Sequence, residues 1–150
     1  MKVEKLKKGF PAHIEKFIRE IDYEFVPSLS TKVDICAWAI KLDLLAINLA
    51  SLDSLGNIEA LLSFYTNEES YITFFAVSKE HRRKGFGSKL LDVCIQECKK
   101  EQSSSIKVET WLSNKKATDL YLSKDFNRIE IRNDRPGDST LVFEKELRFY

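Results

Sequence analysis

A cationic glycine loop, Arg82 to Ser88, lies between an apolar extended run and a long helical pattern. Its sequence, Arg-Arg-Lys-Gly-Phe-Gly-Ser, brings three cations and two glycines together. Glycine lets the backbone approach an anion closely, and the amides of a helix's first turn have no partner inside the helix and lie at its positive end. The order of strand, basic turn and helix therefore predicts a phosphate-binding loop. An ordinary basic turn facing solvent is the alternative interpretation.

The elements that frame this loop can be identified from their periodicity. Tyr71 to Val77 is an apolar extended run, and Ile58 to Tyr65 precedes it across a short turn, which favours antiparallel pairing. A helix is expected from Phe86 to about Gln102. The strand Ile106 to Leu112 follows, and the crossover rule places it parallel to the strand before the loop. The helix residues expected to point inward are Leu90, Leu91, Cys94, Ile95 and Cys98.

Two helices are expected ahead of this unit. The first starts at Pro11 and carries apolar residues at helical spacing as far as Phe25. The second starts near Ser30 or Thr31, whose hydroxyls can cap a helix. The residues of its apolar stripe, expected to face the core, are Val33, Cys36, Ala37 and Ile40.

Shorter elements complete the pattern. A brief strand is expected over Val3 to Leu6, and another around Leu45 to Leu49 begins a three-strand meander. A short helix is expected from Ser113 or Asn114 to about Ser123, with Ala117, Leu120 and Tyr121 on one side. The strands Phe126 to Arg132 and Thr140 to Leu147 are expected to form a closing hairpin.

Composition narrows the function classes. The 150 residues fit a single domain over 1–150, and 24 basic against 23 acidic residues give a formal charge of only +1. That balance disfavours a nucleic-acid or membrane-surface binder. The polar start and the lack of a bilayer-length apolar stretch lead us to expect a cytoplasmic location. No metal site is expected, because His13 and His81 lie far apart and the cysteines are interpreted as small hydrophobes.

Two motifs resemble those of the GNAT superfamily of N-acetyltransferases. Residues 77–91 are similar to its acyl-CoA signature, which reads Arg or Gln, any two residues, Gly, any residue, then Gly or Ala. Arg82, Gly85 and Gly87 fill its fixed places. Residues 114–126 resemble a later motif of the same family, in which an asparagine, an alanine and a Leu-Tyr pair recur.

The resemblance implies an α/β fold with a mixed, mostly antiparallel α+β sheet and about four flanking helices. The fourth and fifth strands are expected to splay apart, with the pantetheine of acetyl-CoA in the gap. Asp125 replaces the usual glycine of the later motif, which is expected to loosen that turn. Asn114 is also a favoured helix cap, so its role stays open. The residues that the resemblance assigns to acetyl-CoA are Ala76, Val77, Arg82, Arg83, Lys84, Gly85, Phe86, Gly87, Ser88 and Asn114.

The resemblance further implies direct attack of a primary amine on the acetyl thioester, with Tyr121 giving a proton to the departing thiolate. A core aromatic is the alternative for Tyr121, because it shares an apolar stripe with Ala117. The base is harder to assign, since Tyr71 to Val77 contains no acid. Glu109, Glu59 and a water relay are the candidates, and either carboxylate could be an ordinary solvated group.

The acceptor, a small-molecule or peptide amine, is expected in a pocket walled by residues 23–38 and 131–140, and a homodimer is left open. A GNAT-like domain that binds acyl-CoA without catalysis, as a sensor or partner module, is the main alternative. A dinucleotide-binding protein is disfavoured, because Leu90 stands where that fingerprint needs its third glycine. The acids that could attract a cationic amine are Asp22, Glu24, Asp34, Asp134 and Asp138, and the rings that could stack on one are Tyr23, Phe25 and Trp38.

Overall fold

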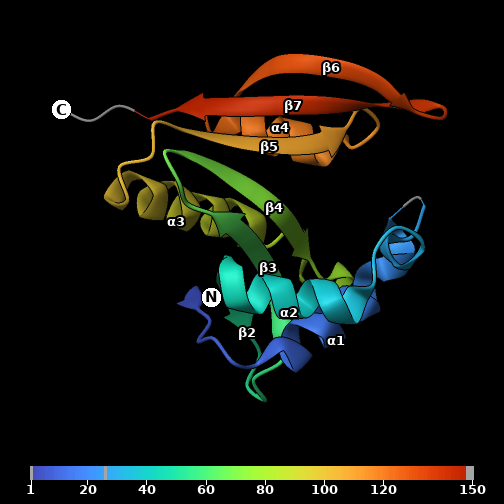
Figure 1. The fold of residues 1–150 in the computed structure, drawn as a ribbon, viewed down its shortest axis with the longest axis vertical. Helices are drawn as coiled ribbons and strands as arrows, with labels where there is room; N and C mark the ends of the chain where they lie inside the picture. Colours follow the sequence, from blue (N-terminus) through green and yellow to red (C-terminus); the bar gives the residue numbers. More distant parts are fainter. Residues whose placement is uncertain (1, 26, 148–150) are drawn as a thin grey trace.

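The computed structural model describes residues 2–25 and 27–147, which form a seven-stranded sheet with helices on both faces (Figure 1). The sheet order is β1-β2-β3-β4-β5-β7-β6. The strands are β1 (Glu4–Lys5), β2 (Ile47–Leu52), β3 (Ile58–Tyr65), β4 (Glu69–Val77), β5 (Ser105–Trp111), β6 (Asn127–Arg135) and β7 (Asp138–Glu146). The helices are α1 (Pro11–Ile21), α2 (Ile35–Leu45), α3 (Phe86–Lys100) and α4 (Lys115–Ser123), with short 3-10 turns η1 (Asp22–Glu24), η2 (Leu29–Thr31) and η3 (Lys79–His81).

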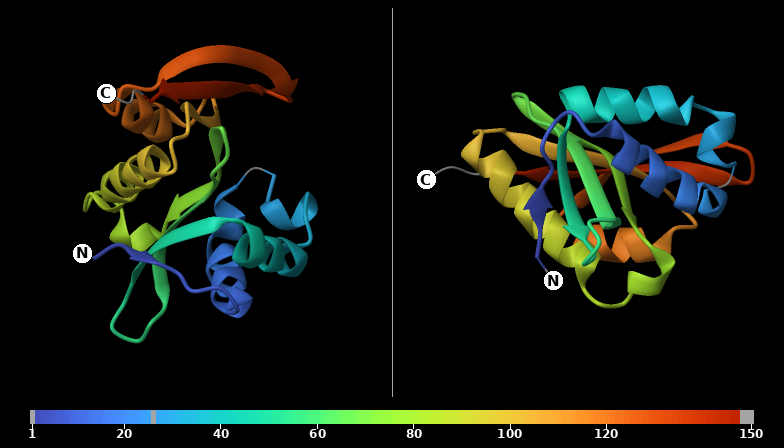
Figure 2. Two further views of the ribbon diagram at one scale, coloured as in Figure 1. Left: turned by 60° about the vertical axis from the view of Figure 1, so that its left-hand side comes forward. Right: turned by 90° about the horizontal axis from the view of Figure 1, so that it is seen from below.

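The helices cover the sheet in two layers, one on each face. The right-hand view of Figure 2 shows the sheet between α1 and α2 on one side and α3 and α4 on the other. One buried cluster joins α1 and α2 to the sheet around Phe17, Leu61 and Phe74. The other joins α3 and α4 to the opposite face around Leu90 and Phe143. Each strand of the centre therefore alternates its side chains between two cores.

The central strands β4 and β5 separate along their length. They pair in parallel only from Glu69 to Ile72 on β4 and from Ser105 to Val108 on β5. Beyond this point they diverge (Figure 1), while β4 keeps its antiparallel partner β3 as far as Val77 and β5 keeps β7 as far as Trp111. The mixed sheet, its parallel pair and the splay are all confirmed.

The expected face of α2 was wrong. The helix begins at Ile35, after Asp34, whose side chain accepts a hydrogen bond from the amide of Ala37 at 3.1 Å. Its buried residues are Ile35, Ala39, Leu42 and Asp43, whereas the stripe expected to be inward, Val33, Cys36, Ala37 and Ile40, is exposed. Most of this helix is apolar on every side, so periodicity does not identify the face. Asp43 is buried because it accepts hydrogen bonds from the amides of Gly9 and Phe10.

The other differences from the expected elements are smaller shifts of helix and strand boundaries. The first helix ends at Ile21, and η1 separates it from Phe25, while Leu45 ends α2 instead of starting a strand. The inward residues of α3 and the closing hairpin β6–β7 agree with expectation. The turn after α4 is not loosened: Asp125 adopts the left-handed conformation that glycine favours, with φ 65°, and its amide donates to Leu122 at 3.1 Å. Within the described residues, no helix is both long and apolar enough to cross a membrane.

Candidate active site

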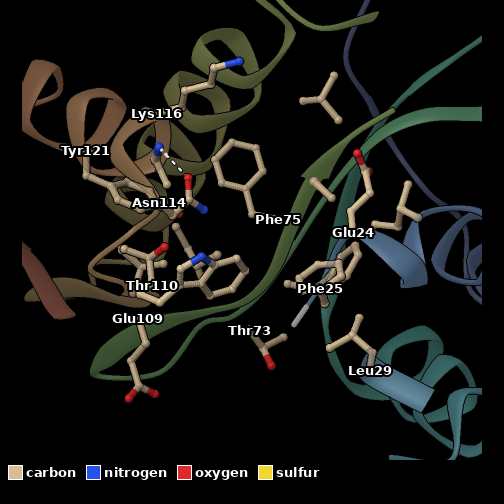
Figure 3. Close-up of a pocket in the computed structure, with 18 of the residues that line it drawn as sticks. Glu24, Phe25, Leu29, Thr73, Phe75, Glu109, Thr110, Asn114, Lys116 and Tyr121 are labelled. Carbon is tan, nitrogen blue, oxygen red and sulfur yellow. Dashed lines mark hydrogen bonds between the residues drawn. The ribbon is translucent and has the colours of Figure 1, made fainter. Parts of the chain in front are cut away.

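A cavity of about 460 Å³ opens where β4 and β5 part. Figure 3 shows Glu24 and Phe25, from the segment after α1, across the cavity from Asn114 and Tyr121. A second cavity, of about 290 Å³, lies toward the glycine loop and shares the β4 residues 75–77 with the first. The two are therefore adjoining ends of one groove, which runs from the loop into the gap between the strands.

The loop before α3 borders this groove, which Arg83 and Gly87 line. Arg83 and Gly85 have φ values of 63° and 80°, so the chain turns sharply and Gly85 serves as the N-cap residue of α3. Within the described ranges, the amides of residues 83–88 donate no hydrogen bond to a protein acceptor. Unpaired amides at a helix N-terminus form an anion-binding site, so the geometry fits a diphosphate.

Gly87 is the point at which the groove approaches the helix backbone. A Cβ atom placed there would lie 3.5 Å from Leu120 Cδ2, 3.6 Å from Phe75 Cζ and 3.8 Å from Val77 Cγ2. Those are ordinary contact distances for one carbon, but a branched side chain would reach further into the second cavity, which Gly87 lines. The glycine thus keeps the groove open.

The edge of β4 offers backbone groups to the gap. The amide of Ser78 donates to the carbonyl of Glu59 at 2.8 Å, so Ser78 and Glu59 form a hydrogen-bonded antiparallel pair. By alternation, Ala76 turns its backbone groups toward β3, whereas Phe75 and Val77 turn theirs toward the gap. The Val77 carbonyl accepts from Arg82 Nε at 3.2 Å. The amide of Val77 and the backbone groups of Phe75, which the sequence did not indicate, therefore face the gap, whereas those of Ala76 do not.

Tyr121 lines both ends of the groove from α4. Only 4% of the residue is exposed, and its ring packs against Phe75, Phe126 and Phe143. Among the described residues its hydroxyl has no hydrogen-bond partner. Burial, with a smaller contribution from the thiol of Cys94, raises the pKa of Tyr121, so the phenol stays protonated near neutral pH. Tyr121 is therefore a core aromatic, as one interpretation of the sequence expected, and it also lines the groove in which a proton donor would have to lie.

Asn114 caps α4 and also lines the groove. Its Oδ1 accepts a hydrogen bond from the amide of Ala117 at 3.2 Å. The side-chain nitrogen belongs to the same planar amide and makes no hydrogen bond to another described residue. The cap is thus present, and the NH₂ group is left to donate to a ligand.

The two candidate bases are both engaged. Glu109 lines the cavity, but its carboxylate forms an ion pair with Arg132 and accepts a hydrogen bond from the Tyr71 hydroxyl at 2.7 Å. Figure 3 shows this carboxylate directed away from Tyr121. Glu59 lies outside both cavities, where it pairs with His81 Nε2 at 3.1 Å and accepts from Ser51.

Comparison with known proteins identifies the family. Residues 14–126 match the model of the acetyltransferase (GNAT) family. The chain belongs to the GNAT family of acetyltransferases. No curated protein sequence matches this GNAT chain significantly.

Solved structures show the same fold. The ribosomal-protein-S18-alanine N-acetyltransferase from Escherichia coli is 19% identical, with a TM-score of 0.82 over 99% of this chain and 95% of that one. Ard1 from Thermoplasma volcanium is 18% identical, with a TM-score of 0.79 over 99% and 98%. A putative streptothricin acetyltransferase from Bacillus anthracis str. Ames, in complex with acetyl coenzyme A, is 20% identical, with a TM-score of 0.62 over 69% and 64%.

The acids expected to attract a cationic amine do not form a free acidic pocket in this GNAT domain. Among the described lining residues, Glu24 is the one member of that set, and it forms an ion pair with Arg82 at 2.5 Å. Three of the others bind backbone amides instead: Asp22 accepts from Ser30, Asp34 from Ala37 and Asp138 from Ser139. Asp134 is engaged by a hydrogen bond with Thr140, which lowers the pKa of its carboxyl. Of the expected rings, Phe25 and Trp38 line the cavity and Tyr23 does not.

Sequence patterns missed several lining residues. Trp111 and Thr110 end β5, while Thr73 and Phe74 lie in β4 where the pairing with β5 stops. Their position at the divergence of two strands depends on where the parallel ladder ends, and local periodicity does not encode that point. The charged lining residues that sequence reasoning did not single out are Lys32, Lys116 and Arg135.

Proposed function

We propose that this GNAT acetyltransferase uses acetyl-CoA to acetylate a primary amine of a small molecule or peptide in the groove between β4 and β5. The observation that carries the proposal is the coincidence of three features in one groove. Unpaired amides of residues 83–88 lie at one end, the open edge of β4 follows, and the hydroxyl of Tyr121 lies on the wall.

Different groups of the protein would bind different parts of acetyl-CoA. The amides of residues 83–88 would hold the diphosphate, and Arg83 and Lys84 would add charge at the exposed surface. The backbone of Phe75 and Val77 would pair with pantetheine amides in the gap, as an added strand would. The side-chain nitrogen of Asn114 would donate to the same arm. The acetyl thioester supplies the acyl group and a sulfur leaving group.

The reaction needs no further reactant. The amine nitrogen forms a bond to the acetyl carbon, the carbon–sulfur bond breaks, and its electron pair goes to sulfur. One proton leaves the amine and one reaches the thiolate, so atoms and charge balance. Tyr121 is the donor that we assign to the thiolate, because its buried phenol is protonated and makes no hydrogen bond to another described residue.

Proton removal from the amine is assigned to water. The two carboxylates among the described lining residues, Glu24 and Glu109, are both held by arginines. Glu109 is retained as a residue that could relay the proton outward, because it lies at the cavity wall beside the Tyr71 hydroxyl. Replacement of Glu109 by Gln separates the two routes: a relay through Glu109 loses turnover, and direct transfer to water does not.

The alternative of a non-catalytic acyl-CoA sensor draws support from the absence of an unpaired lining carboxylate within the described residues. Thiol release from acetyl-CoA, followed with a panel of amines, distinguishes the two. The proposal expects amine-dependent release, whereas a sensor binds acetyl-CoA without it. Failure of acetyl-CoA to bind at all would overturn both. A cytosolic location and a homodimer stay predictions from the sequence.

A further inference from the structure

The acceptor end of the groove has an aromatic wall, which we define as Phe25, Trp38, Phe74 and Trp111. Phe25 contacts Phe74 across 6.4 Å and Trp111 across 5.9 Å, measured between ring centroids, while Trp38 and Phe74 lie 5.5 Å apart. All four line the cavity. Phe25 thus joins β4 to β5 across their divergence, and the wall offers flat apolar surface to a ligand.

Apart from two ion pairs, the charged side chains that line this end of the groove are cations. Arg82 neutralises Glu24, and Arg132 neutralises Glu109. The remaining charged lining residues within the described ranges are all cations: Lys32, Lys116 and Arg135. Lys116 also lines the second cavity, beside the glycine loop, and so belongs with the anionic cosubstrate.

Two of these cations belong to the acceptor end. Lys32 directly follows η2, and its side-chain ammonium makes no hydrogen bond or ion pair to another described residue. Arg135 ends β6 and holds its guanidinium carbon 5.0 Å from the ring centroid of Trp111. One cation therefore lies directly on the aromatic wall, and the other reaches the cavity from the α1–α2 connection.

We propose that the acceptor is an amine that also carries a carboxylate and an aromatic or large apolar group, so that Lys32 holds the carboxylate while the aromatic wall, with Arg135 against Trp111, holds the apolar group. This inference rests on the proposed acetyl transfer. It replaces the sequence-based expectation that acids attract a cationic amine. Polyamines and other polycations are disfavoured, because a second ammonium would meet like charge in a partly enclosed site.

The same cations favour catalysis. An attacking amine must be neutral, and nearby positive charge destabilises its ammonium form. The cavity therefore assists deprotonation of the acceptor even though both of its described carboxylates are paired. The charge that selects the substrate also compensates for a weak base.

A set of matched amines tests the proposal by thiol release from acetyl-CoA. Free phenylalanine has the amine, ring and carboxylate; phenylalaninamide and phenethylamine lack the carboxylate; spermidine lacks both carboxylate and ring. We expect kcat/KM for phenylalanine to exceed that for phenylalaninamide by about tenfold, as for one charge-assisted contact. Phenylalanyl-aspartic acid α-amide, whose one carboxylate is on the second side chain, distinguishes a peptide acceptor from a free amino acid. Equal rates for phenylalanine and its amide, or a preference for spermidine, would overturn the proposal.

A charge-reversal variant of Lys32 provides a second test of the proposal. Lys32→Glu should raise KM for phenylalanine, or for the dipeptide α-amide if that is preferred, by about tenfold and leave KM for phenethylamine within about twofold. Lys41→Glu, an exposed residue of α2 outside the cavity, makes the same charge change and should alter neither. An equal effect of both variants would reject a local contact and leave acetyl transfer intact.

If no amine releases thiol, acetyl transfer itself fails, and binding decides the inference separately. Calorimetry with the CoA-bound protein should then still show phenylalanine or its peptide binding more tightly than the uncharged analogues, and more weakly to Lys32→Glu. Equal or absent binding of all of them would overturn the inference.

Discussion

Tyr121 is both a buried core residue and the proton donor that we propose for the reaction. Its ring is part of the core that α4 shares with the sheet, while its hydroxyl lacks a protein partner among the described residues. We therefore expect Tyr121→Phe to change the free energy of unfolding by less than about 1 kcal/mol, because no protein hydrogen bond is lost. We expect kcat to fall by about 100-fold, the size of a typical acid contribution.

Steady-state thiol release and thermal unfolding measure the two effects. Tyr65→Phe, a phenol on β3 outside both cavities, is the matched control and should retain turnover. Unchanged turnover in Tyr121→Phe would remove the acid role.

Substitutions at Gly87 and Lys84 test whether the backbone or the side-chain charge of the loop contributes more to CoA binding. Gly87→Val places branched methyls into the cavity toward Leu120 and Phe75, so affinity for CoA should fall by more than about tenfold. Lys84→Ala removes one exposed charge and should cost about threefold. Isothermal titration calorimetry with CoA gives the dissociation constants of both variants. The reverse order of effects would mean that side-chain charge, and not the backbone, carries the binding.

At the residue scale, the sequence predicted what local patterns encode. Gly87, Asn114 and Tyr121 line the groove and Gly85 caps α3, because motif spacing fixes their places on a loop and two helices. It did not predict that Glu24 is neutralised, since its partner Arg82 lies 58 positions away. Pairing between distant segments is a tertiary property.

Among the elements, α2 shows the limit of periodicity. A helix that is apolar nearly all round gives no stripe, and its one buried carboxylate, Asp43, is satisfied by the distant amides of Gly9 and Phe10. By contrast, α3 has a clear polar face, and its five inward residues were correct. The sequence determines a face only where the two faces differ in composition.

The turn after α4 gives a prediction at this scale. Asp125 holds a left-handed φ of 65°, which is strained for a residue with a Cβ. Asp125→Gly should therefore raise the free energy of unfolding by about 0.5–1 kcal/mol in chemical denaturation. Lys99→Gly, at an exposed right-handed position of α3, should instead lower it by a similar amount. Destabilisation by both changes would show that the Asp125 side chain contributes more than its strain costs.

For the whole molecule, the crossover rule and the family resemblance together predicted the splayed parallel pair. A ligand that bridges this divergence binds the folded state alone. Acetyl-CoA at about 100 times its dissociation constant should add about 2.7 kcal/mol to the free energy of unfolding and raise Tm by about 8 °C. Differential scanning calorimetry checks this, with Gly87→Val at the same ligand concentration as the control. Absence of a shift in the unsubstituted protein at millimolar acetyl-CoA would contradict the groove assignment.

Arg82 belongs to the loop motif, yet its guanidinium forms an ion pair with Glu24 on the opposite wall and its Nε donates a hydrogen bond to the carbonyl of Val77 at the end of β4. One side chain therefore contacts both the acceptor end and the acetyl-CoA end of the groove. Any rearrangement of Arg82 when the first ligand arrives is felt by the second, and thermodynamic reciprocity requires the communication to run equally in both directions. Binding of acetyl-CoA would then change the affinity for the acceptor, and the acceptor would change the affinity for acetyl-CoA by the same factor, through a single guanidinium.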